Sequence, residues 1–90
     1  MDINRYAIGC RIRNIRKYLG MPQEVLAVRC GRTIAYIKSI EDGQSRLSVK
    51  TLVILSEALG VTADYILRGE RPLIYPRFHA LSSIVKSKHD

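Results

Sequence analysis

Residues 23–43, QEVLAVRCGRTIAYIKSIEDG, decide how this chain folds. Their apolar residues form two short helical patterns, one on each side of Gly31. Ala27 is small enough to let a second helix cross closely, and Gly31 tolerates the positive φ of a tight turn. Ile37 and Ile40 follow at helical spacing and can anchor the second helix. Together these residues predict two short helices that cross at a fixed angle around a turn.

Helical patterns flank this stretch on both sides. An apolar stripe predicts a helix over residues 4–19, ended by Gly20; the stripe comprises Ile8, Ile12, Ile15 and Leu19. Pro22 suits the start of the second helix and Thr33 the N-cap of the third. Two more helices are expected over residues 48–60 and 62–69, because each range has a hydroxyl cap and a glycine stop. No segment alternates like an exposed strand, so the expected fold is all-α, with five helices in a domain of residues 1–69.

Residues 70–90 have a different character. Pro72 and Pro76 break any helix there, and large apolar residues recur afterwards: Phe78, Leu81, Ile84 and Val85. A fully disordered tail rarely carries so many large apolar side chains. We therefore expect this C-terminal extension to dock on the domain or to pair with a second subunit, with fraying as the alternative.

The positive charge of the chain is concentrated in its first half. The net charge is +7; residues 1–50 hold ten Lys or Arg against four Asp or Glu, and residues 51–90 hold five against four. Such a surface suits nucleic acid or an anionic membrane. The basic residues are spread over a packed domain rather than along one amphipathic helix, which argues against a membrane.

Cysteine and histidine usage does not suggest a metal site or an enzyme. Cys10 and Cys30 lie far apart, and His79 and His89 are isolated near the end of the chain. We therefore expect no cofactor, no metal, no small-molecule ligand and no catalytic residue. No stretch reaches the roughly 20 apolar residues that span a bilayer. Two reduced thiols in a cytoplasmic protein are expected.

Residues 8–69 resemble the Cro and phage-repressor type of helix-turn-helix domain, often called XRE-type, over about two-thirds of the chain. The resemblance rests on the opening IGCRIRNIRK, on the closing LVILSEALGVTADYIL, and between them on Gln23, Leu26-Ala27, Gly31, Ile37, Ile40-Glu41 and Gly43. It implies the five-helix, lambda-repressor-like DNA-binding fold, with residues 70–90 as a short extension.

The resemblance also assigns roles to individual residues. In this family the second of the two crossing helices enters the major groove, and the first begins at a phosphate. The residues expected to bind DNA are Gln23, Arg32, Thr33, Ile34, Ala35, Tyr36, Lys38, Ser39 and Arg46. Arg16 and Glu41 match a pair that forms an interhelical salt bridge, so they are expected to be structural, like Ala27, Gly31, Ile37 and Ile40.

Ile34 and Ala35 depart from the family pattern, which often has Gln, Asn, Arg or Ser at these groove-facing positions. Apolar side chains can contact a thymine methyl but donate no hydrogen bond. Either specificity depends on thymine methyls and DNA shape, or this helix faces a protein partner. Burial of Ile34 against the second helix, and packing alone for Tyr36, are the structural alternatives.

We therefore expect a sequence-specific DNA-binding transcriptional regulator, acting as a homodimeric repressor on a palindromic operator in double-stranded DNA. One domain of this size contacts only a few base pairs, and two-fold pairing is the usual way to gain affinity. The fifth helix and residues 70–90 are the candidate dimer surface. The alternative is a protein-interaction module on the same scaffold, with a toxin or an antirepressor as the partner.

Overall fold

A computed structural model describes residues 4–70, which form five α-helices and no β-strand. The helices are α1 (Arg5–Tyr18), α2 (Gln23–Cys30), α3 (Ile34–Glu41), α4 (Val49–Leu59) and α5 (Ala63–Arg68). The all-α, five-helix prediction is confirmed. None of these helices is both long enough and apolar enough to cross a membrane. The expectations for the extension from residue 71 onward lie outside the described residues.

Local sequence chemistry explains where the helices begin. Three of them start at a hydroxyl side chain that accepts a hydrogen bond of 3.0–3.1 Å from the backbone N–H three residues later: Thr33, Ser48 and Thr62. Asn4 caps α1 with its amide oxygen, which accepts from the N–H groups of Tyr6 at 2.8 Å and Ala7 at 3.3 Å. Such caps satisfy backbone donors that have no partner inside the helix. The expected cap residues are therefore in place.

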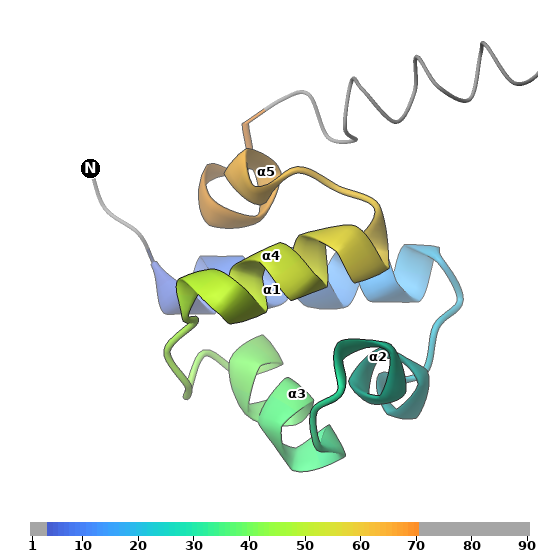
Figure 1. The fold of residues 1–90 in the computed structure, drawn as a ribbon. Coiled ribbons are helices and arrows are strands. Elements are labelled where there is room, and N and C mark those ends of the chain that lie inside the picture. Colours follow the sequence, from blue (N-terminus) through green and yellow to red (C-terminus); the bar gives the residue numbers. More distant parts are fainter. Residues whose placement is uncertain (1–3, 71–90) are drawn as a thin grey trace, which may run out of the picture.

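Contacts within five pairs of helices hold the domain together. α1 contacts α3 and α5, while α4 contacts α2 and α5, and α2 packs against α3. Figure 1 shows α2 and α3 at one end of the domain and α5 at the opposite end, with α1 and α4 between them. The fully buried apolar side chains of the core come from all five helices: Ile12, Leu26, Ile37, Leu55 and Ile66. This arrangement leaves one side of α3 outside the core.

Gly9 allows α1 and α3 to approach each other closely. A Cβ atom added to this buried glycine would lie only 2.5 Å from the backbone oxygen of Ile40. Real Cβ atoms do not come so near to a backbone oxygen, so no other residue fits without separating the two helices. The sequence pattern did not single out Gly9, because its role depends on a contact with residues about thirty positions away.

Candidate nucleic-acid interface

The α2–α3 turn has the geometry of a tight helix crossing. Gly31 ends α2 in the left-handed conformation, with φ 63° and ψ 37°. The Arg32 N–H then donates to the carbonyl oxygen of Ala27 at 2.9 Å, which closes the turn. Ala27, Ile37 and Ile40 are all buried in the core. Their packing fixes the orientation of α3 against α2.

The outer side of α3 is open to solvent. Among the predicted DNA-binding residues, the exposed ones are Thr33, Ile34, Ala35, Lys38 and, in the loop after α3, Arg46. Ile34 is 47% exposed, so the alternative in which it is buried against α2 is wrong. An exposed isoleucine beside a lysine gives this helix a mixed apolar and cationic surface.

The remaining predicted residues of this region are partly engaged within the domain. Tyr36 is half-buried and packs against the core, so packing accounts for part of its surface. The Ser39 hydroxyl is hydrogen-bonded to the Ser45 hydroxyl in the following loop. Arg32 is half-buried, and its Nη1 donates to the carbonyl oxygen of Gly31 at 3.2 Å. These three side chains would have to exchange or share existing contacts in order to touch DNA.

Glu41 is the centre of a buried polar network behind α3. Arg16 donates to both carboxylate oxygens, from Nε to Oε2 at 2.6 Å and from Nη2 to Oε1 at 3.0 Å. The Gln23 Nε2 also donates to Glu41 Oε1 at 3.0 Å. The Glu41 side chain is fully inaccessible to solvent. Arg16 and Glu41 therefore form the expected interhelical ion pair, and Gln23 is joined to it.

Arginines of α1 hold other helices in place. Arg13 Nη2 donates to Asp42 Oδ1 at 2.7 Å and to the Glu41 carbonyl oxygen at 3.2 Å. Arg11 Nη1 donates to the carbonyl oxygen of Ile66 at 3.0 Å, at the end of the domain where α5 lies. Of the basic residues of α1, only Arg5 and Lys17 are exposed. The adjacent acidic residues Glu41 and Asp42 are the sequence signal for the contacts that Arg13 and Arg16 make with α3.

The N-terminus of α2 lies beside the Gln23 side chain. Pro22 precedes the helix and makes no side-chain cap. The first backbone N–H groups of a helix have no partner within it and carry a partial positive charge. The Gln23 residue is half-buried, and Glu41 holds its amide. This end of α2 is chemically suited to an anionic oxygen.

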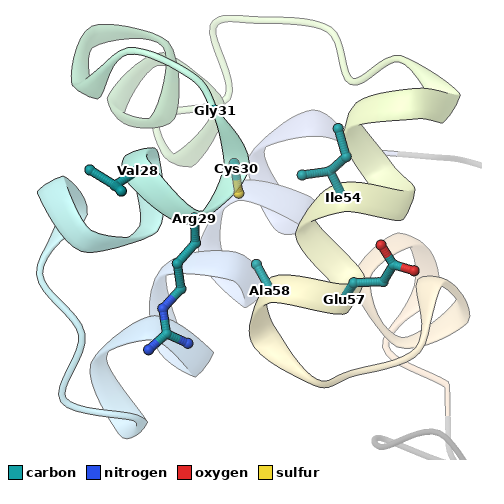
Figure 2. A pocket seen from close by; sticks show the side chains of 7 residues that line it. All are labelled: Val28, Arg29, Cys30, Gly31, Ile54, Glu57 and Ala58. Atoms are coloured by element: carbon teal, nitrogen blue, oxygen red, sulfur yellow. The ribbon is translucent and has the colours of Figure 1, made fainter.

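A separate hollow of about 570 Å³ lies between α2 and α4. Figure 2 shows Arg29 reaching out from α2 and Glu57 from α4, with Ala58 between them. None of the predicted DNA-binding residues lines it. Its lining includes Cys30, whose pKa is raised by burial and lowered to a lesser extent by Arg32. Within residues 4–70, no three His, Cys, Asp or Glu side chains gather in a way that could hold a metal ion.

The fold and the paired helices define a helix-turn-helix domain of the class found in phage repressors. The model of the helix-turn-helix family matches residues 12–66, more than half of the chain. The chain therefore belongs to this family, in its Cro and phage-repressor-like, XRE-type branch.

Two similar proteins carry names from transcription control. A transcriptional regulator in the ATPase CF(0) region of Rhodospirillum rubrum is 38% identical over 58 residues, which are 64% of this chain and 54% of that protein. The HTH-type transcriptional regulator y4dJ of Sinorhizobium fredii is 36% identical over 62 residues, which are 69% of this chain and 79% of that protein. The chain thus spans about half the length of the first relative and most of the second.

Solved structures of similar fold include a repressor bound to its operator. The P22 c2 repressor in complex with a synthetic operator is 33% identical, with a TM-score of 0.67 and coverage of 70% of this chain and 96% of that one. The restriction-modification controller protein C.AhdI of Aeromonas hydrophila is 30% identical, with a TM-score of 0.66 and coverage of 68% and 92%.

Proposed function

We propose that this protein is a sequence-specific DNA-binding transcriptional regulator, a dimeric repressor that places α3 in the major groove of a palindromic operator. The observation that carries the proposal is the two-sided environment of α3. Its inner side is buried against α1 and α2, while Thr33, Ile34, Ala35 and Lys38 remain exposed. A helix held rigidly from behind, with a free outer face, is what groove recognition requires.

The charge distribution supports DNA as the partner. Lys38 is exposed on α3, and Arg46 is exposed in the loop that follows it, where it borders Arg5 and Leu67. The N-terminus of α2 adds a partial positive charge. Phosphate contacts of this kind supply most of the affinity, while contacts to base edges supply sequence preference. In this scheme Lys38 and Thr33 offer polar contacts, and Ile34 and Ala35 read thymine methyl groups.

Dimerisation is proposed because one α3 covers only a few base pairs. Figure 1 shows α5 at the end of the domain opposite α2 and α3. A contact between two copies through α5, with or without residues 71–90, would therefore leave α3 free. A regulator of this kind acts in the cytoplasm. The names of the relatives, and the operator in the P22 c2 structure, support this proposal.

Selection of bound sites from random double-stranded DNA tests the proposal. The expected result is a palindrome with half-sites about one helical turn apart. Titration of the selected site should then show a loss of affinity of about 10³- to 10⁵-fold between 50 and 200 mM salt, if the dimer makes six to ten phosphate contacts. An affinity that does not change over this salt range would rule out DNA binding of this kind.

The exposed Ile34 favours one competing function, a protein-interaction module on the same scaffold. Two variants separate the proposals. Lys38→Glu combined with Arg46→Glu should abolish retention on DNA if the partner is DNA. Unchanged DNA retention in that variant, together with loss of a partner protein in Ile34→Asp, would favour the interaction module.

A further inference from the structure

We propose that Glu41 is a positioning residue that orients the Gln23 amide toward a DNA phosphate. The buried Arg16–Glu41 ion pair would then hold the helices together and also set the contact between the Gln23 amide and the DNA backbone. This inference rests on the proposed function and names a part of that same site.

The chemistry of the two side chains determines which way the amide faces. An ionised carboxylate only accepts hydrogen bonds, so the amide must turn its nitrogen toward Glu41. The observed contact is the donation from Gln23 Nε2 to Glu41 Oε1 at 3.0 Å. An amide nitrogen carries two hydrogens, and this contact uses one of them. The second hydrogen remains available for an anionic oxygen outside the domain.

Without Glu41 as its partner, the Gln23 amide would have no preferred orientation. A free amide can present either its nitrogen or its oxygen to solvent, and its oxygen would repel a phosphate. Because Gln23 is the first residue of α2, the oriented N–H lies at the same helix end as the free backbone N–H groups. Side chain and helix terminus thus offer donors to one anion.

The Glu41 carboxylate is itself held rigidly. Arg16 donates to both of its oxygens, at 2.6 and 3.0 Å, and the side chain is fully inaccessible to solvent. Arg16 also donates from Nη1 to the carbonyl oxygen of Met21 at 2.7 Å, in the segment that leads into α2. One arginine therefore fixes both the carboxylate and the backbone just before Gln23. The amide has little freedom to turn away while this network is intact.

If the ion pair only stabilises the fold, its removal should not affect DNA binding by a variant that still folds. A paired substitution separates this structural role from the proposed orienting role of Glu41. Arg16→Met with Glu41→Leu replaces the ion pair by apolar side chains of similar size, a type of exchange that often preserves folding. If the pair only stabilises the fold, a folded double variant should bind DNA with the wild-type affinity. If Glu41 orients the amide, the double variant should lose one phosphate contact per subunit.

The experiment compares wild type, Gln23→Met, the Arg16→Met/Glu41→Leu variant and the triple variant on the selected operator at several salt concentrations. Gln23→Met keeps the length of the side chain and removes its donors. Gln23→Met and the paired variant should each lower affinity at every salt concentration and leave the slope of log affinity against log salt unchanged, because a neutral amide releases no counterion from the phosphate. Affinity should fall on the order of tenfold per subunit, as for loss of a charge-assisted hydrogen bond. The triple variant should lose nothing further.

Asp42→Asn is the matched control, because it alters the ion pair between Arg13 and Asp42 and leaves both the Gln23–Glu41 hydrogen bond and the 3.6 Å contact of Arg13 Nε with Glu41 Oε1 in place. Its affinity for the operator should not fall below that of wild type. A folded paired variant with the wild-type affinity, or effects of Gln23→Met and the paired variant that add in the triple variant, would overturn the proposal.

A second measurement does not depend on DNA. In the free protein, NMR relaxation of the Gln23 side-chain NH₂ group should report a rigid amide in wild type and a mobile one in the paired variant. An equally mobile amide in both would overturn the inference. If wild type showed a rigid amide but no salt-dependent DNA binding, the proposed function would fail while the Glu41 contact stood, so the two failures are distinguishable.

Discussion

The two sides of α3 use the same residue type for opposite purposes. Ile37 is 1% exposed and Ile34 is 47% exposed, although they lie one turn apart on the same helix. The first packs into the core between helices, and the second faces solvent. The difference teaches that position relative to the scaffold, rather than residue chemistry, divides this helix into a supporting side and a contacting side. Substitutions on the supporting side should therefore cost stability, and those on the contacting side should change binding alone.

The largest expected effect comes from breaking the buried ion pair on the supporting side. Glu41→Gln leaves the Arg16 guanidinium buried without its counter-charge, since Arg16 is itself buried. The free energy of unfolding should fall by about 3–5 kcal/mol. Urea denaturation followed by circular dichroism measures it. Asp42→Asn, which breaks only the half-exposed pair with Arg13, should cost no more than about 1 kcal/mol, and a similar loss in both variants would contradict the distinction.

Truncating each isoleucine tests the comparison directly. Ile37→Ala should reduce the free energy of unfolding by about 2–5 kcal/mol, because it opens a cavity in the core. Ile34→Ala should change it by less than about 0.5 kcal/mol, as is usual for exposed sites. In binding to the selected operator, Ile34→Ala should instead weaken discrimination at one position by about 1 kcal/mol, the value of one lost apolar contact with a thymine methyl. Equal losses of stability in the two variants would contradict the comparison.

Gly9→Ala should destabilise the domain by about 2 kcal/mol. Alanine gains about 1 kcal/mol in helix propensity over glycine, but a Cβ pressed against the α3 backbone costs about 1–3 kcal/mol or more. The clash should prevail because the obstacle is the Ile40 carbonyl, which cannot rotate away like a side chain. Thermal unfolding measures the change. Cys10→Ala, at the exposed neighbouring position, is the control and should lie within about 0.5 kcal/mol of wild type.

The smallest expected effect concerns the reactivity of the two thiols. One thiol is buried and the other exposed, as for Ile37 and Ile34 of α3. Cys10 is exposed and Cys30 is buried. Burial raises the pKa of Cys30, so its thiol stays protonated and unreactive at neutral pH. A thiol reagent should label Cys10 quickly and Cys30 only as the domain opens. Because the pKa in the fold is raised, the contribution of Cys30 to stability is fully present at neutral pH and is lost as pH rises through that pKa.

Local features of the fold could be predicted from sequence because their causes lie within a few residues. Thr33 caps α3 and Gly31 adopts a positive φ for reasons that are visible in the adjacent sequence. The buried side of α3 followed from the helical spacing of Ile37 and Ile40, whereas its outward-facing residues were expected only from the family resemblance. These features need no knowledge of which helices meet.

The contacts that sequence reasoning missed depend on tertiary neighbours. The Gln23–Glu41 hydrogen bond joins residues 18 positions apart, and the Arg13–Asp42 bond joins residues 29 apart. No periodicity within one helix relates such partners. The Ser39–Ser45 contact crosses from a helix into a loop whose path the sequence does not determine. Side chains that seemed free to read DNA were therefore found to be engaged already.

The hydrogen bond from Arg11 to the Ile66 carbonyl oxygen spans 55 positions of the chain. Bringing such distant segments together costs more loop entropy than pairing neighbouring helices. We therefore expect α5 to join the folded domain last and to open first under native conditions. Hydrogen exchange should show this order. The free energy of opening should be lower for the amides of the six-residue α5 than for those of α1. Substitutions at Arg11 should then speed exchange in α5 selectively.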